Sequence, residues 1–278
     1  MSQIYYPIFD ADILIYRCGF AAQRNEYSIE GGPTFRYKKE LKEFLESQGS
    51  SIDADVWEVN TIIEPLENAL NNVRTTLTSI MDRLGNPKNY SMYLTGKDNF
   101  REEIAITRGY KANRDKEHRP AWYKEIRQYL VDRWTAEIVD GIEADDAIAY
   151  KVFDWHLGES LAGGEPVIVS TDKDLNQIEG WHYNWVRDDL YFINAAEAIK
   201  YFWIQMISGD ATDNIQGIPG MGEVKAEKLL DSLDPFEWES SVFELYMETY
   251  DEGGPQVFEE HKELIQIGAS HRKPIKEE

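Results

Sequence analysis

Four short acidic motifs are the strongest candidates for chemistry in this chain. They read FDAD, EADD, TDKD and GDATD, and they supply the carboxylates of Asp10, Asp12, Glu143, Asp145, Asp146, Asp172, Asp174, Asp210 and Asp213. Carboxylates held a few ångströms apart repel one another unless cations neutralise them. Mg²⁺ prefers oxygen ligands of this kind, and a pair of such ions is a common device for phosphodiester cleavage. The motifs therefore indicate a site for two divalent cations.

The elements around these motifs predict an α/β fold, a mostly parallel twisted sheet with helices on both faces. The apolar stretches IYYPIFD and PVIVS are typical of buried strands and lead directly to Asp10 and Asp172, while TAEIVD leads to Glu143. Because the carboxyl ends of parallel strands open on one crevice, at least three motifs should face the same space. A single acid at a helix start could instead be a cap, and Asp12 and Glu143 are the most cap-like.

The remaining pattern places helices between the strands and a helical region at the end of the chain. Helices are expected at 12–23, 64–84, 120–133 and 143–156, a further strand at 90–96, and a hairpin from WHYNWV and DLYFIN at the sheet edge. Residues 25–63 predict two short strands around Gly31 and an exposed strand at 56–60. We expect residues 1–194 to form the sheet domain, with a basic arch at about 97–133, and residues 195–278 to form a smaller helical subdomain.

Two further motifs favour contact with a phosphate backbone. In GIPGMG, the small residues of a turn between helices would let backbone N–H groups reach a phosphate, and Lys225 follows the turn. In YKANR, Tyr110 precedes Lys111 and Arg114, two cations that could clamp a phosphate and stabilise transition-state charge, and Arg101 would support the same surface. The alternatives are a plain turn and a solvated loop.

Composition limits the classes of protein. The 278 residues carry a formal charge of −22, which disfavours a generally nucleic-acid-binding surface, but ten of the 29 basic residues lie between Lys97 and Arg133 with only seven acids. The single cysteine, Cys18, excludes an internal disulfide and a thiolate metal cluster. No apolar run reaches the roughly 18 residues of a membrane span, and the start of the chain lacks a signal-peptide pattern. We expect a soluble, cytoplasmic protein.

The order of these motifs resembles the 5′-to-3′ exonuclease and flap endonuclease superfamily, most of all the tailed-phage 5′-exonucleases. FDAD, NFRE, YKANR, GIEADDAIA, VIVSTDKDL and GDATDNIQGIPGMGEVKA occur in the family order over about residues 4 to 230. The resemblance implies a PIN-like α/β domain with a helical arch and a helix–three-turn–helix motif. It implies a monomer, in the host cytoplasm if phage-encoded, that hydrolyses DNA near 5′ ends of duplexes, nicks or flaps. RNA–DNA hybrids are a further candidate substrate.

The resemblance also implies roles for individual residues. Asp10, Glu143 and Asp145 would hold one Mg²⁺ or Mn²⁺, and Asp146, Asp172, Asp174 and Asp213 the other, with Asp210 close by. Lys111 and Arg114 would contact the scissile phosphate, so that Lys111, Arg114, Asp145 and Asp146 form the catalytic set. The duplex-gripping hairpin would comprise Gly217, Ile218, Gly220, Gly222 and Lys225, with a K⁺ held at 217–222. Tyr110 and Arg101 complete the expected DNA-binding surface.

One position departs from the family pattern, and other functions compete. Relatives usually carry an Asp where this chain has Gly96, and Asp98 lies two residues further along. A haloacid-dehalogenase-type phosphatase would use Asp10 as nucleophile and Asp12 as acid, but it leaves EADD and GIPGMG without a purpose. A non-catalytic DNA-binding module is the main alternative, and an RNA-directed PIN-type nuclease is another.

Overall fold

The computed structural model describes residues 5–53, 57–113, 119–158 and 164–268. Clustering of contacts separates two compact units, residues 1–13, 80–117 and 134–278 in the first, and residues 14–79 and 118–133 in the second. Helices α7 to α10 belong to the same unit as the main sheet, so the division expected at residue 194 stays a prediction. No helix within the described ranges is long and apolar enough to cross a bilayer.

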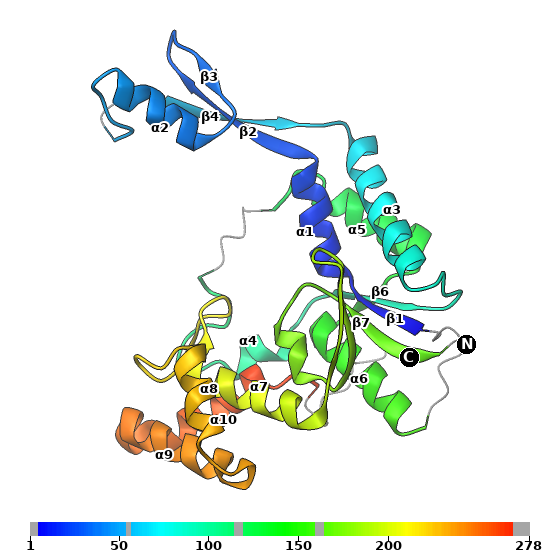
Figure 1. The fold of residues 1–278 in the computed structure, drawn as a ribbon, viewed down its shortest axis with the longest axis vertical. Helices are drawn as coiled ribbons and strands as arrows, with labels where there is room; N and C mark the ends of the chain where they lie inside the picture. The colour runs from blue at the N-terminus through cyan, green and yellow to red at the C-terminus, as the bar shows by residue number, and fades with distance from the viewer. Residues whose placement is uncertain (1–4, 54–56, 114–118, 159–163, 269–278) are drawn as a thin grey trace. The chain divides into compact units, whose positions relative to one another are not determined.

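The first unit is built on the expected, mostly parallel sheet (Figure 1). Its strand order is β6-β5-β1-β7-β8-β9, and every neighbouring pair is parallel except β8 with β9, which form the predicted edge hairpin. The strands are β1 (Tyr5–Asp10), β5 (Ser91–Thr95), β6 (Glu137–Val139), β7 (Glu165–Val169), β8 (Gly180–Asn184) and β9 (Asp189–Ile193). Buried Val, Ile and Leu side chains fill the central strands, as a sheet covered on its faces requires.

Helix α6 (Ala144–His156) packs on this sheet and forms its core there. Its apolar residues Ile148 and Val152 contact Ile8 of β1, Val139 of β6 and Ile168 of β7 in one buried cluster. The helix begins at Glu143, and the N–H of Glu143 donates to the Oδ2 atom of Asp146 at 3.2 Å, a capping contact. The core packing therefore fixes the start of α6 beside the carboxyl ends of the strands.

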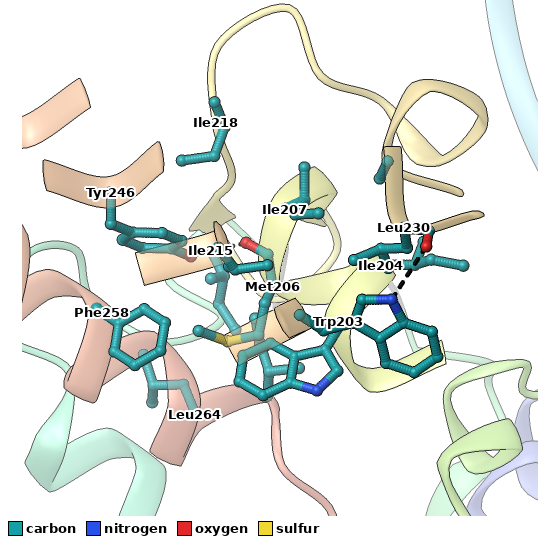
Figure 2. Close-up of a cluster of buried hydrophobic side chains, with 14 of the residues drawn as sticks. Trp203, Ile204, Met206, Ile207, Ile215, Ile218, Leu230, Tyr246, Phe258 and Leu264 are labelled. Carbon is teal, nitrogen blue, oxygen red and sulfur yellow. Dashed lines mark hydrogen bonds between the residues drawn. The ribbon is translucent and has the colours of Figure 1, made fainter. Parts of the chain in front are cut away.

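The C-terminal helices share a second core within the same unit. Figure 2 shows Trp203, Met206 and Ile207 of α7 (Ala195–Ser208) gathered with Tyr246 and Phe258. This core joins α7 to α8 (Glu223–Asp231), α9 (Trp238–Tyr250) and α10 (Gly254–Ile265), and the short helix α4 (Phe100–Ile104) contacts α10. Between α7 and α8 lie the two-residue strands β10 (Gly209–Asp210) and β11 (Ile215–Gln216). Large aromatic side chains thus anchor the hairpin that precedes α8.

The second unit contains a helical part and a three-stranded antiparallel sheet. Strands β2 (Gln23–Ile29) and β4 (Trp57–Ile63) pair along their full length, and β3 (Thr34–Phe35) pairs with β2. Helix α2 (Lys38–Ser47) follows β3 and buries Leu41 and Leu45, a helix that the sequence pattern did not predict. The unit also contains most of α1 (Ala11–Ala21), of α3 (Leu66–Arg83) and of α5 (Tyr123–Trp134), three helices that the spacing of apolar residues predicted.

Candidate active site

The carboxyl ends of β1 and β7 are joined by hydrogen bonds that place two of the predicted acids. Ser170, directly after β7, donates its hydroxyl to the Oδ2 atom of Asp10 at 2.9 Å. The N–H of Asp172 donates to the same Ser170 hydroxyl at 3.0 Å. Because β1 and β7 are parallel neighbours, this serine holds both acids at one edge of the sheet. Ser170 was not predicted as a site residue, although it stands within the motif VIVSTDKDL.

A first group of acids lies around Asp10, and their charges raise one another's pKa values. Burial raises the pKa of Asp10 to about 7, with the carboxylates of Asp12 and Asp172 adding to the rise and the Ser170 hydrogen bond opposing it. Burial also raises the pKa of Asp145 well above its usual value, and Asp10, Asp172 and Glu143 raise it further. Asp12 accepts the N–H of Thr95 at 2.9 Å. The structure thus brings acids of three motifs together.

A second group of acids surrounds Asp174. Burial raises the pKa of Asp174 to about 8, and Asp172, Asp210 and Asp213 contribute in that order. Gln205 of α7 donates its side-chain amide to the Oδ1 atom of Asp174 at 2.7 Å. Asp210 accepts the N–H groups of Thr212 at 2.7 Å and Asp213 at 3.2 Å, which ties the fourth motif into a tight loop. Asp172 interacts with both groups and links them.

Tyr110 and Lys111 lie against Glu143 and Asp213. The Tyr110 hydroxyl is 2.8 Å from the Oε2 atom of Glu143 and 2.7 Å from the Oδ2 atom of Asp213, and its single proton can serve only one of them at a time. The Lys111 ammonium contacts Glu143 and lies 3.7 Å from Asp213. Burial would raise the pKa of Glu143, but the charges of Lys111 and Arg101 outweigh it and lower that pKa. The pKa of Glu143 is therefore lowered where the pKa values of Asp10 and Asp145 are raised.

Arg101 and Asp146 form a buried ion pair directly beside this cluster. The guanidinium donates to both carboxylate oxygens of Asp146, at 2.5 and 2.9 Å, and the two side chains are 2% and 1% exposed. Arg101 also donates to the carbonyls of Leu264 and Gln266, both at 2.9 Å. Asp146 accepts the N–H of Gly268 at 3.0 Å. Both side chains therefore lie in the protein interior. The DNA-binding role of Arg101 and the metal-binding role of Asp146 stay predictions.

The segment that follows α10 completes the back of the site. Gln177 donates to the carbonyl of Ile265 at 2.9 Å and accepts the N–H of Ile267 at 3.2 Å. Glu260 of α10 accepts the N–H groups of Ile106 and Thr107, each at 2.8 Å, and so holds the loop that leads to Tyr110. All four contacts join residues between 88 and 154 positions apart, and no sequence pattern signalled them.

One pocket unites most of the predicted acids. It is lined by Tyr110, Glu143, Asp145, Asp174, Asp210 and Asp213, together with Gln177 and Gln205. Arg114, the second predicted clamp residue, lies outside the described residues.

Asp98 is exposed with a left-handed φ of 60°, and the absence of an acid at position 96 has a steric reason. A Cβ at Gly96 would lie 2.0 Å from the Asp140 carboxylate and 2.6 Å from the carbonyl of Val139.

The donor set fits divalent cations, although the carboxylates are not arranged as a closed cage. In the described part of the chain, no group of three or more acids, histidines or cysteines is gathered as a preformed metal site. Buried acids whose pKa values rise to about 7 and about 8 are nevertheless acids that lack a neutralising partner. The buried hydroxyl of Tyr201 in α7 has no hydrogen-bond partner among the described atoms, and Asp174 and Asp210 are among the charges that act on it. Hydrated cations among these acids would neutralise the carboxylates and offer the Tyr201 hydroxyl a water as hydrogen-bond partner.

The glycine hairpin after β11 divides into a packed part and an open part. A Cβ at Gly217 would lie 2.2 Å from the carbonyl carbon of Ser208, so only glycine fits there. Ile218 is buried in the helical core and donates its N–H to Ile207 at 2.7 Å. A Cβ at Gly220 or Gly222 would meet nothing within 4 Å, although the φ of 77° at Gly220 itself favours glycine. Lys225 donates to the carbonyl of Gly220 at 2.7 Å.

Comparison with known proteins finds exonucleases and flap endonucleases among the relatives of this chain. No family model matches the chain. An exodeoxyribonuclease of Enterobacteria phage T3 is 30% identical over 145 residues, which cover 51% of this chain and 46% of the relative. An exonuclease of Escherichia phage T7 is 28% identical over 141 residues, covering 50% and 45%. The flap endonuclease Xni of Shewanella sediminis is 31% identical over 119 residues, covering 38% and 43%. Each match spans somewhat less than half of the curated relative.

Solved structures agree on the fold. A mutant of the T5 5′-exonuclease has a TM-score of 0.51 at 13% identity, covering 95% of this chain and all of that one. The T5 5′-exonuclease with bound divalent zinc ions has a TM-score of 0.50 at 15% identity, covering 94% and 100%. The chain is thus similar in sequence to 5′-to-3′ exonucleases and flap endonucleases and shares the fold of the T5 5′-exonuclease. The predicted resemblance to this family, the fold class and the kinship to phosphodiester hydrolases are thereby confirmed, and the relatives give the phosphatase alternative no support.

Proposed function

We propose that this protein is a metal-dependent nuclease that hydrolyses DNA phosphodiester bonds near 5′ ends. The observation that carries the proposal is the pocket in which acids of three separate motifs meet, with Asp10 of the fourth motif interacting with Asp145 and Lys111 lying against Glu143. In a protein without a cation partner for these acids, their mutual repulsion would be a pure cost to folding. A metal-dependent reaction on a phosphodiester accounts for that cost.

Under this proposal, most of the acids in the site hold the metal ions. Asp10, Asp145, Asp172, Asp174, Asp210, Asp213 and Glu143 would hold two divalent cations, Mg²⁺ or Mn²⁺. Bound cations would supply Lewis acidity toward the phosphodiester and the attacking water. Asp146 is the predicted ligand that we set apart, because four hydrogen bonds from Arg101, Gly268 and Glu143 already use both of its oxygens.

Lys111 would contact the substrate directly. Its ammonium lies against Glu143 and near Asp213, a cation stored beside the acids. From this position, Lys111 would meet the negative charge of the scissile phosphate, while Glu143 and Asp213 would hold the cations. Tyr110 would keep Glu143 oriented through its hydroxyl. Arg114 would act with Lys111 by analogy with the family motif.

The hairpin at Gly217–Gly222 would grip the backbone of the duplex. Gly220 and Gly222 leave open space around their backbone, and such contacts carry no sequence information. The G222A variant should therefore keep the stability of the wild type and lose DNA affinity, whereas G217A should fail to fold normally. A K⁺ at this turn, action on RNA–DNA hybrids and a role in phage DNA replication or primer removal belong to the same proposal.

The decisive experiment is digestion of DNA labelled at its 5′ or 3′ end. Blunt duplex and 5′-flap substrates would be incubated with Mg²⁺, Mn²⁺ or EDTA, using the wild type, D145N and the exposed control D82N. The proposal requires short products from the 5′ label with either metal, in the wild type and D82N only. The ratio of flap to duplex cleavage then distinguishes the two family activities. Binding of flap DNA without any cleavage would leave a non-catalytic DNA-binding module.

A further inference from the structure

A second cavity lies beside the carboxylate cluster and has no role in the proposed metal chemistry. It encloses about 320 Å³, at the lower end of the volumes typical of small-ligand pockets. Its wall is formed by the segment after β7 and by the β8–β9 hairpin. Asp172 lines this cavity and also interacts with Asp10, Asp145 and Asp174 in the cluster. The cavity is therefore the immediate neighbour of the proposed reaction centre.

Two asparagines present hydrogen-bond donors to this cavity. The side-chain oxygen of Asn184 accepts the N–H groups of Val186 and Arg187, each at 3.2 Å. The side-chain oxygen of Asn176 accepts the hydroxyl of Tyr191 at 2.9 Å. With both oxygens used, each asparagine has its NH₂ group, with two donors, for a ligand. In the described ranges, neither NH₂ group has a hydrogen-bond partner.

Two basic side chains, Lys173 and Arg187, line the cavity, and only Lys173 has a carboxylate partner in the described structure. Lys173 forms an ion pair with Glu223 of α8. Arg187 lies at the exposed turn of the hairpin, and its guanidinium makes no ion pair with any described residue. In a chain with a formal charge of −22, an arginine without a carboxylate partner beside two amide donors is a receptor for an external anion. Asp172 and Asp189, which also line the cavity, would repel that anion, so it would lie on the side of Arg187.

Tyr191 gives the cavity a fixed wall. Its ring stacks on the buried ring of His182, with centroids 5.3 Å apart and planes inclined by 16°, and its hydroxyl is held by Asn176. A ring fixed in this way loses little conformational entropy when a ligand packs against it. The cavity thus combines a guanidinium for a phosphate, amide donors for the acceptor atoms of a base and a rigid aromatic wall.

We propose that this cavity is a subsite for one nucleotide of the substrate strand, next to the scissile phosphodiester. Arg187 binds the phosphate of that nucleotide, and Asn176 and Asn184 donate hydrogen bonds to its base. The inference rests on the proposed function, because only a nuclease substrate would bring a DNA strand to this subsite. It deepens that function by placing one nucleotide beyond the metal site on the β8–β9 hairpin, rather than on the arch or the glycine hairpin.

The test is binding of a single nucleotide to the full chain in EDTA, where no cleavage occurs. Deoxyadenosine 5′-monophosphate, deoxyadenosine and inorganic phosphate would be titrated and followed by NMR, with the wild type, R187Q, R187K and the control R74Q, at an exposed arginine outside the expected arch. A charged hydrogen bond contributes about 1.5–3 kcal/mol, so R187Q should weaken binding of the monophosphate by about tenfold or more. R187K should recover part of the affinity, and R74Q should match the wild type.

Cleavage kinetics then tie the subsite to the reaction. With Mg²⁺, R187Q should raise KM for duplex DNA severalfold and leave kcat within about twofold, since a bond made equally in ground and transition states changes KM alone. Equal binding and equal KM in R187Q and the wild type would overturn the proposal. Inorganic phosphate binding as tightly as the monophosphate would also overturn it, because a bare anion site would then suffice. If the wild type cleaves no DNA but binds the monophosphate through Arg187, the nucleotide site stands and the nuclease function fails.

Discussion

Two neighbouring acids at the start of α6 show how differently one fold can treat buried carboxylates. Asp146 is met by the guanidinium of Arg101 and by two backbone N–H groups. Asp145 is surrounded by Asp10, Asp172 and Glu143, with only Lys111 opposing them, and its pKa rises. The protein pairs the first acid directly with a cation, whereas the second lies mainly among other acids. A buried acid that is neutralised by the protein holds the structure together, whereas one that is not is available to a ligand.

The largest expected effect separates these two acids by activity. Changing Asp145 to Asn should lower the cleavage rate by a factor of about a thousand or more, because loss of a group that acts on the transition state costs several kcal/mol. The variant should remain folded, since an amide closely resembles the protonated carboxyl that burial favours at this position. Single-turnover cleavage and a thermal melt of the same preparation would measure both. A D145N variant with near-normal activity would remove the distinction between the two acids.

The next effect is on stability and concerns Asp146. Changing Asp146 to Asn removes the hydrogen-bonded carboxylate of the buried Arg101 and leaves only Glu143, 3.6 Å away, to oppose its charge. Breaking a buried ion pair typically costs about 3–5 kcal/mol of unfolding free energy. Urea unfolding of the metal-free protein would measure it, with D82N as the control. Because the ion pair is independent of the ligand, added Mn²⁺ should not restore the loss. Full stability in D146N would show that this pair is not structural.

The pH dependence of stability should reveal the acids that lack a partner. The pKa values of Asp10 and Asp174 lie at about 7 and about 8 in the folded protein, above the value near 3.9 for an unfolded Asp. Between pH 4 and 8 the folded state therefore holds more protons than the unfolded state, so stability falls as pH rises. In EDTA, the melting temperature should be highest near pH 4 to 5 and decline toward pH 8.

Divalent cations should reverse this decline. They compete with protons for the same carboxylates and bind the folded state, so millimolar Mn²⁺ should raise the melting temperature more at pH 8 than at pH 5. A melting temperature that is independent of both pH and Mn²⁺ over this range would contradict the assignment of Asp10 and Asp174 to a metal site.

The smallest effect concerns the hydroxyl of Tyr201. Its oxygen is buried without a hydrogen-bond partner in the described structure, so changing Tyr201 to Phe should leave the stability of the metal-free protein unchanged or slightly higher. If the hydroxyl contacts the hydration shell of a bound cation, the variant should bind Mn²⁺ a few times more weakly, the cost of about one hydrogen bond. Calorimetric titration with Mn²⁺ would compare the two proteins, and identical affinities would exclude that contact.

Much of the fold followed from local patterns. The apolar runs that end at Asp10 and Val169 predicted β1 and β7, and the periodic apolar residues of 64–84 predicted α3, because these patterns depend only on which faces are buried. The elements within residues 25–63 were harder to predict. Helix α2 was missed although Leu41, Phe44 and Leu45 have the i, i+3, i+4 spacing of a helix, because the pattern extends over only ten residues.

The sequence by itself determined that acids follow strand ends in the order of the nuclease family, and hence that they meet at one edge of the sheet. It could not separate Asp145 from Asp146. Adjacent residues on a helix point about 100° apart, so local geometry sends them to different surroundings but does not say which surroundings contain a cation. That was decided by Arg101, 45 positions earlier, and by Gly268, 122 positions later, which only tertiary packing brings to Asp146. The same packing closed the space at Gly96 to any side chain.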